Sequence, residues 1–100
     1  MSQPAPRQRT VISAASKPAM PPHIKMRHDA GRDRWIILAP ERVFDPDEIA
    51  VEVLKLCDGA RTVGDIADHL AKEYNAPRED IEADIITMLQ DLADKGVVKA

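Results

Sequence analysis

The sequence has very few of the residues that hold a small fold together covalently or through a metal ion. Cysteine occurs once in 100 residues, at Cys57, so no disulfide forms within the chain and no second thiol completes a zinc cluster or a redox pair. A reducing compartment, the cytoplasm, is therefore expected. Aromatic residues make up 3% and hydrophobic residues 44% of the chain, which allows one modest core and one compact domain.

Long apolar runs are missing as well. No uninterrupted apolar segment approaches the roughly 20 residues that a transmembrane helix needs. The N-terminus also lacks the continuous apolar stretch of a secretory signal. We therefore expect no membrane partner and no processing of the chain.

Motifs that carry catalysis or bind a cofactor are absent from the sequence. The histidines lie far apart, at His23, His28 and His69, and none has the spacing that puts two imidazoles on one helical face. The glycines are isolated, so there is no phosphate-binding loop. Cys57 lies in an apolar stripe, where a thiol behaves as a small buried hydrophobic group. The sequence predicts a non-enzymatic domain without metal or cofactor.

The net charge of -3 hides a strong asymmetry along the chain. Residues 1–34 carry seven basic and two acidic residues, a charge of +5, whereas residues 35–100 carry seven basic and fifteen acidic residues, a charge of -8. Residues 78–95, a predicted helix, contain two basic and six acidic residues. DNA phosphates repel such a surface, so the charge argues against a nucleic-acid partner.

The N-terminal stretch, residues 1–22, is rich in Pro, Ala, Ser and Gln. Only Val11 and Ile12 offer paired apolar bulk there, which is too little buried surface to offset the entropy of ordering the segment. We expect residues 1–22 to be a disordered Pro-rich tail or linker and residues 23–100 to form the folded domain. The alternative is an arm that orders on a partner.

Three short strands are predicted at the start of the domain. Ile24, Met26 and His28 alternate with charged residues, which is the period of a half-buried strand. Residues 34–38 form a second strand, in which Trp35, Ile36, Ile37 and Leu38 make an apolar run that suits a central position. A third, very short strand at residues 42–44 precedes a proline that interrupts it.

Three helices are predicted after the strands. Asp45, followed by a proline and then a glutamate three residues after the cap, predicts the first N-cap, and this helix is expected to end at Asp58-Gly59. Its expected apolar stripe is Ile49, Ala50, Val53, Leu56 and Cys57.

The second and third helices carry their own start and stop signals. Thr62 and Asp65 form a capping pair, and this helix should stop near Asn75. The third helix should open at Pro77 and close at Lys95-Gly96, with an apolar stripe of Ile81, Ile85, Met88, Leu89 and Leu92. Val97 and Val98 should then fold back against the core. The expected class is an α+β, winged helix-turn-helix-like domain, in which a three-stranded antiparallel sheet precedes a three-helix bundle.

The element order leaves two functions open. Winged helix-turn-helix domains place a helix in the major groove of DNA, although the acidic third helix opposes this. The third strand can instead be an open edge that receives an extended peptide, with the third helix beside it. Ile86 lies about 100° from the centre of that helix's apolar stripe and supports a groove, unless the apolar face is simply wide.

A distinctive pattern begins at Val43-Phe44-Asp45 and continues with Val53-Leu54-Lys55-Leu56-Cys57-Asp58-Gly59 and then Arg61-Thr62. This pattern resembles the PqqD family of pyrroloquinoline quinone (PQQ) biosynthesis proteins, and the resemblance extends from about Ile24 to Val98. It implies a recognition element for a ribosomally synthesized and post-translationally modified peptide (RiPP). The implied partners are the precursor peptide PqqA and the radical S-adenosylmethionine (SAM) enzyme PqqE, which cross-links a Glu and a Tyr of that peptide.

The resemblance also implies where the peptide lies, along the third strand and against the third helix. The residues it assigns to the peptide are Arg42, Val43, Phe44, Asp45, Glu82, Ile85, Ile86 and Leu89. Family members commonly have Asn at the position of Asp45. The Pro-rich tail resembles a linker to the oxidase that completes PQQ synthesis, so a fusion is the expected context. The basic strand residues, Lys25, Arg27, Arg32 and Arg34, are a candidate surface for the enzyme.

Overall fold

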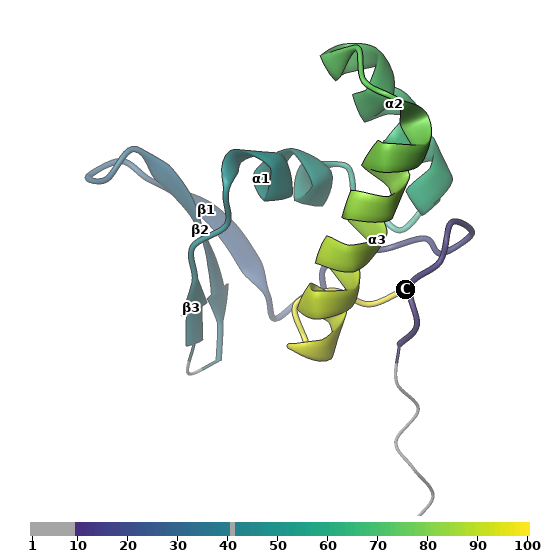
Figure 1. Cartoon of the computed structure of the whole chain (residues 1–100). Coiled ribbons are helices and arrows are strands. Elements are labelled where there is room, and N and C mark those ends of the chain that lie inside the picture. The colour runs from purple at the N-terminus through teal and green to yellow at the C-terminus, as the bar shows by residue number, and fades with distance from the viewer. Residues whose placement is uncertain (1–9, 41) are drawn as a thin grey trace, which may run out of the picture.

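The computed structural model describes residues 10–40 and 42–100 and shows three strands followed by three helices (Figure 1). The elements are β1 (Lys25–Asp29), β2 (Arg34–Ala39), β3 (Arg42–Phe44), α1 (Glu48–Lys55), α2 (Val63–Tyr74) and α3 (Arg78–Asp94). This confirms the predicted α+β order and the winged helix-turn-helix-like class.

The sheet is antiparallel, with β2 in the centre and β1 and β3 at its edges. Ile37 of β2 lies opposite Met26 of β1 and Phe44 of β3. Because side chains alternate across a strand, these three share one face of the sheet. Ile37 is fully buried, so this is the face that meets the helices.

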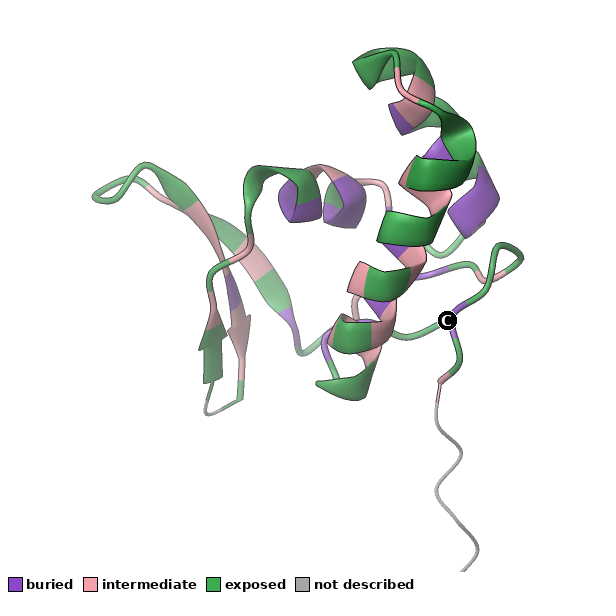
Figure 2. Cartoon of the chain, viewed as in Figure 1, coloured by how far each residue is buried: buried purple, intermediate pink, exposed green. Residues whose placement is uncertain are grey.

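The core lies where the sheet and the three helices meet, and Ile12, Val97 and Val98 from outside these elements join it (Figure 2). Its most deeply buried side chains include Ile37, Val53, Val63, Ile66, Leu70, Ile85, Leu89 and Val97. The predicted return of Val97 and Val98 to the core is confirmed, since both are buried. The core is therefore built mainly from aliphatic residues, as the scarcity of aromatics required.

The N-terminal segment, which we define as residues 10–22, packs onto the helices instead of forming a disordered tail. Ile12 is 5% exposed and belongs to the core. Ala19 pairs with Lys99 through two backbone hydrogen bonds of 2.8 Å, which joins the two ends of the domain. The prediction of a disordered tail is wrong for residues 10–22, and residues 1–9 lie outside the described residues.

Backbone hydrogen bonds explain why so polar a segment is held. The first amides of a helix have no partner within it. The first two amides of α2, at Val63 and Gly64, donate to the carbonyls of Ser16 (2.9 Å) and Ala14 (3.0 Å). The N-terminal segment therefore caps α2, and the apolar composition of the segment alone gave no sign of this.

Helix α1 begins two residues later than predicted. Asp47, not Asp45, is the N-cap, and its carboxylate accepts a hydrogen bond of 2.8 Å from the Ala50 amide. Asp45 forms an ion pair with Arg34 of β2 instead. The predicted stripe was also partly wrong, because Ile49 is 56% exposed, while two residues outside that stripe, Val51 and Leu54, are buried.

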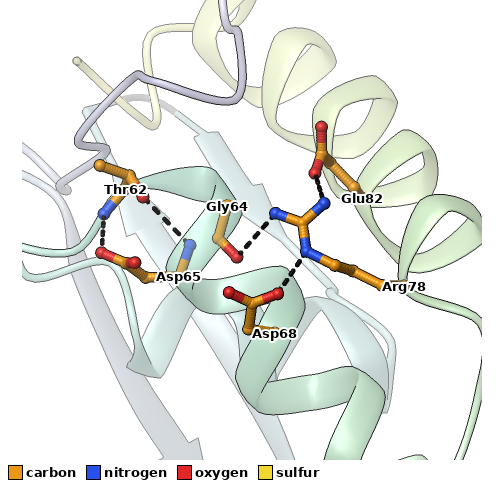
Figure 3. Close-up of polar contacts among 6 residues, drawn as sticks. All are labelled: Thr62, Gly64, Asp65, Asp68, Arg78 and Glu82. Carbon is orange, nitrogen blue, oxygen red and sulfur yellow. Dashed lines mark hydrogen bonds and ion pairs between the residues drawn. The ribbon is translucent and has the colours of Figure 1, made fainter.

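The predicted capping pair of α2 is confirmed (Figure 3). The Thr62 hydroxyl accepts from the Asp65 amide (3.0 Å), and the Asp65 carboxylate accepts from the Thr62 amide (3.1 Å). Asn75 ends the helix in the left-handed conformation, at φ 50°. These signals are local, so the sequence was enough to locate both ends.

Arg78 joins the beginning of α3 to α2 (Figure 3). Its guanidinium donates to the carboxylates of Asp68 on α2 and Glu82 on α3, and to the Gly64 carbonyl at 3.5 Å. The pairs are partly exposed and add little stability individually. Their consequence is geometric, because the side chain of Glu82 is directed to Arg78.

A candidate peptide-binding groove

The edge strand β3 offers unpaired backbone groups. It pairs with β2 on one side, and no strand among residues 10–40 and 42–100 pairs with its other side. In an antiparallel pair, alternate residues direct both their N–H and C=O groups away from the partner strand. Val43, in the middle of β3, is 67% exposed. This edge can therefore accept an additional strand.

An apolar cleft lies between β3 and the C-terminal half of α3. We call this space of about 190 Å³ the β3 cleft. Its apolar lining comes from Ile37, Phe44, Pro46, Ala50, Met88 and Leu92. Asp91 and Lys95 stand at its border and form an ion pair of 2.8 Å with each other. The cleft can take apolar side chains of a chain that lies along β3.

Arg42 and Phe44 share the side of β3 that faces the cleft. The Arg42 guanidinium carbon lies 5.1 Å from the centroid of the Phe44 ring, a distance at which a cation attracts an aromatic face. Phe44 is half-buried and lines the cleft. The predicted strand residues 42–45 thus surround the open edge, and their contact with a peptide stays a prediction.

The α3 residues assigned to the peptide do not line this cleft. Ile85 and Leu89 are 2% and 0% exposed and belong to the core. At about 100° per residue, Ile86 lies about 200° from Met88, on the opposite side of the helix. Glu82 lies on that same opposite flank and is paired with Arg78. None of these four residues lines the β3 cleft, and their contact with a peptide stays a prediction.

The N-terminal segment covers the flank of α3 that carries Ile86. Gln90, one turn further along, accepts a hydrogen bond from the Ile12 amide (2.9 Å) and donates to the Thr10 carbonyl (2.8 Å). Ile86 is half-buried and packs against the core cluster. The wide-apolar-face interpretation of Ile86 matches the structure, and the groove interpretation does not.

Met88 and Leu92 are the α3 residues that the sequence interpretation missed. Both were placed in the predicted core stripe, yet both are only half-buried and line the β3 cleft. Apolar residues stand on both flanks of the α3 stripe, so the pattern could not tell which flank faces β3. The only signal in the sequence was the position of Met88 and Leu92 at one border of the stripe.

The motif that carries the family resemblance builds the turn between α1 and α2. Asp58 accepts hydrogen bonds from the amides of Ala60 (2.9 Å) and Arg61 (3.0 Å), and these bonds lower the pKa of its carboxyl. Gly59 has φ 79°, a conformation that favours glycine, and its amide donates to the Pro18 carbonyl (3.0 Å). The motif is structural and lies outside the β3 cleft.

The residues that the structure describes contain neither an activated thiol nor a cluster suited to a metal ion. Cys57 is buried, and its burial, with a smaller effect of Asp58, raises the pKa of the thiol to about 12. The thiol donates to the Val53 carbonyl at 3.2 Å, so it is not a thiolate nucleophile near neutral pH. Among these residues no cluster of His, Cys, Asp or Glu has the arrangement of a metal site.

A second, more polar cavity of about 410 Å³ lies between the β1–β2 hairpin and α1. The Trp35 ring in its lining is already covered by a side chain of the domain, because the Lys55 ammonium lies 4.8 Å from the centroid of that ring. His28 packs edge-on against the same ring, with centroids 5.5 Å apart.

None of the helices in the described part of the chain is long and apolar enough to span a membrane.

The order of three strands followed by three helices makes this a small winged-helix-like domain. Its exposed strand edge beside an apolar cleft is an arrangement that can receive an extended peptide. The sequence model of the family described as Coenzyme PQQ synthesis protein D (PqqD) matches residues 34–98. The chain belongs to this family, as its motif indicated.

Relatives and solved structures agree with this assignment. The PqqA binding protein of Bradyrhizobium diazoefficiens is 62% identical over 85 residues, which cover 85% of this chain and 82% of that protein. The solution NMR structure of the PqqD truncation of Methylobacterium extorquens PqqCD, described as a functional and stand-alone RiPP recognition element, has a TM-score of 0.80 and 44% identity, and the match covers 92% of this chain and 98% of that one.

Two further relatives bear on the limits of the domain. The crystal structure of PqqD from Xanthomonas campestris gives a TM-score of 0.54 at 40% identity, over 84% of this chain and 93% of that one. The bifunctional coenzyme PQQ synthesis protein C/D of Methylorubrum extorquens is 46% identical over 90% of this chain, which amounts to 24% of that protein. Both separate and fused forms of this domain therefore exist among its relatives.

Proposed function

We propose that this chain binds the precursor peptide PqqA and holds it in an extended form for the enzyme that modifies it in PQQ biosynthesis. The open edge of β3 beside the β3 cleft is the observation that carries this proposal. The names of its relatives, PqqA binding protein and RiPP recognition element, support it.

The mechanism follows from the geometry of the edge. A peptide that adds a strand to β3 forms backbone hydrogen bonds, and these are insensitive to sequence. Its side chains alternate between the two faces, so every second one points toward the β3 cleft and gives specificity. Binding fixes an otherwise flexible chain, and the apolar burial must offset that ordering entropy. The domain itself makes and breaks no bond in this scheme.

The charge of α3 does not favour the nucleic-acid alternative. The basic residues at the two ends of the helix are both paired with carboxylates, Arg78 with Asp68 and Glu82, and Lys95 with Asp91. The helix therefore presents acidic groups to its surroundings, and a DNA phosphate would be repelled.

Calorimetric titration of the full chain with the PqqA peptide of Bradyrhizobium diazoefficiens tests the proposal directly. We expect saturable one-to-one binding with a negative heat-capacity change, because apolar surface is buried. Binding of an unrelated peptide of equal length and charge with the same affinity would contradict a recognition role.

We propose PqqE, the radical SAM enzyme, as the partner that receives the complex, and the outer face of the sheet as its docking surface. Lys25 and Arg27 are both exposed and share that face, opposite the face that carries Met26. Arg32 and Arg34 are less available, because they pair with Asp29 (3.9 Å) and Asp45.

Charge reversal tests this docking surface. A K25E/R27E variant should bind PqqE more weakly in the presence of PqqA, with a difference that shrinks as salt is added. The control is Lys72→Glu on α2, an exposed change of the same sign. Unchanged affinity of K25E/R27E for PqqE would remove the docking surface from the account. Fusion to the oxidase and a cytoplasmic location stay predictions.

A further inference from the structure

A third cavity, separate from the β3 cleft, lies where α1, α2 and α3 meet. We call this space of about 230 Å³ the helix pocket. Its walls include Ile49, Tyr74, Ile81 and Met88, and its floor is formed by the buried side chains of Leu70 and Ile85. The pocket is therefore an apolar depression that reaches down to the core.

Exposed apolar side chains gather at this pocket. In the described part of the chain, four large hydrophobic side chains are exposed, and two of them, Ile49 (56%) and Tyr74 (49%), stand at its mouth. Exposed apolar residues that cluster around a depression mark an interaction site more often than scattered ones do.

The helix pocket and the β3 cleft lie next to each other along α3. Met88 borders both, and the neighbouring α1 residues Ile49 and Ala50 line one each. The α3 residues also repeat: positions 81, 84, 85 and 88 line the helix pocket, and positions 88, 91, 92 and 95 line the β3 cleft. The two sites are therefore seven residues, or two helical turns, apart.

This spacing sets the distance between the two apolar side chains of a single ligand that fills both sites. Two helical turns correspond to roughly 10 Å along α3. An extended peptide advances about 3.3 Å per residue, so it covers that distance in about three residues. Because only every second side chain of a strand points to one face, the two side chains must be two or four residues apart.

We propose that the helix pocket receives a second apolar side chain of the peptide that pairs with β3, two or four residues from the side chain that enters the β3 cleft. This inference rests on the proposed function, and it assigns the peptide two apolar anchors at a defined spacing. The occupant is a segment of PqqA that continues past Phe44 and Asp45, where β3 ends and α1 begins.

The charge around the helix pocket narrows the choice of occupant. Asp84 lies at its border, is exposed, and forms no ion pair with any residue in the described ranges. Desolvation, followed by the carboxylates of Glu52, Glu73 and Glu48, raises the pKa of the Tyr74 phenol. A peptide that places a basic or neutral residue beside its second anchor fits this rim better than an acidic one.

The test compares Ile49→Ser with Val11→Ser in the full chain. Val11 is 69% exposed and lines none of the three cavities, so it is a matched control for the loss of an exposed apolar side chain. With the Bradyrhizobium PqqA peptide, we expect Ile49→Ser to weaken binding roughly fivefold to tenfold, because part of a side chain loses its burial, and Val11→Ser to leave affinity unchanged. The methyl resonances of Ile49 and Ile81 should shift on titration of the unaltered chain.

The outcomes separate this inference from the proposed function. If the unaltered chain does not bind PqqA, the proposed function fails. If it binds and Phe44→Ser weakens binding, while Ile49→Ser has no effect and neither methyl resonance shifts, only the helix pocket is refuted. Self-association of the free chain that Ile49→Ser abolishes would show that a second copy fills the pocket and would also overturn the inference.

Alanine substitutions in the peptide provide the second readout. When the apolar peptide residue that enters the helix pocket is replaced by alanine, the peptide should bind the unaltered chain more weakly. The same replacement should not change binding to the Ile49→Ser variant, because the two substitutions remove the same contact. A peptide residue two or four positions away should behave in this way with Phe44→Ser. Full additivity of every pair would contradict the two-anchor arrangement.

Discussion

Replacing Met88 with Asp should weaken PqqA binding by about 2 kcal/mol, or roughly thirtyfold, while the domain stays folded. Met88 is half-buried at the border between the β3 cleft and the helix pocket. A carboxylate at this position would lose its water when an apolar peptide side chain packs against it, and that desolvation opposes binding. Calorimetry measures the affinity, and circular dichroism checks that the variant is folded.

The matched control for Met88 is its neighbour. Thr87 is exposed on α3 and lines none of the cavities, so Thr87→Asp adds the same charge to the same helix without entering the groove. We expect this variant to bind PqqA with an affinity close to that of the unaltered chain. Equal losses for the two variants would mean that the net charge of α3, and not the groove, governs binding.

Replacing Ile12 with Asp should lower the free energy of unfolding by about 2–4 kcal/mol. Ile12 is 5% exposed in the core, so the variant loses the burial of an apolar side chain. The new carboxylate must either be buried, which costs desolvation free energy, or reach water by disrupting the packing around it. For a domain of this size, the midpoint of thermal unfolding should fall by roughly 10 °C or more. Urea unfolding followed by circular dichroism measures the change.

Val11→Asp is the control for Ile12, because Val11 is adjacent in sequence and 69% exposed. Its effect should stay within about 0.5 kcal/mol. A disordered tail would tolerate both substitutions equally well. The difference in unfolding free energy between the two variants therefore decides whether residues 10–22 are part of the domain.

The features that could be predicted from the sequence are the ones fixed by nearby residues. The capping pair of Thr62 and Asp65 satisfies backbone groups within one turn of α2, so it located that helix correctly. The alternation around Met26 and the proline after β3 likewise depend on a few neighbours. Such signals do not require any knowledge of how the elements pack.

The features that were missed depend on contacts between distant residues. The sequence interpretation placed the cap of α1 at Asp45, whereas Asp47 is the N-cap and Asp45 pairs with Arg34 of β2. The N-terminal segment is held by amides at the start of α2, which no local pattern reveals. The groove face of α3 depends on where β3 lies, so Met88 was assigned to the core.

Amide hydrogen exchange at the two sheet edges, with and without PqqA, tests the central claim most directly. If the peptide adds a strand to β3, the outward-facing amides within Arg42–Phe44 should exchange at least about tenfold more slowly in the complex. The amides of β1 (Lys25–Asp29), at the opposite edge, should keep their rates. Protection at β1, or no new protection at β3 when the chain is saturated with PqqA, would contradict binding by strand addition at this edge.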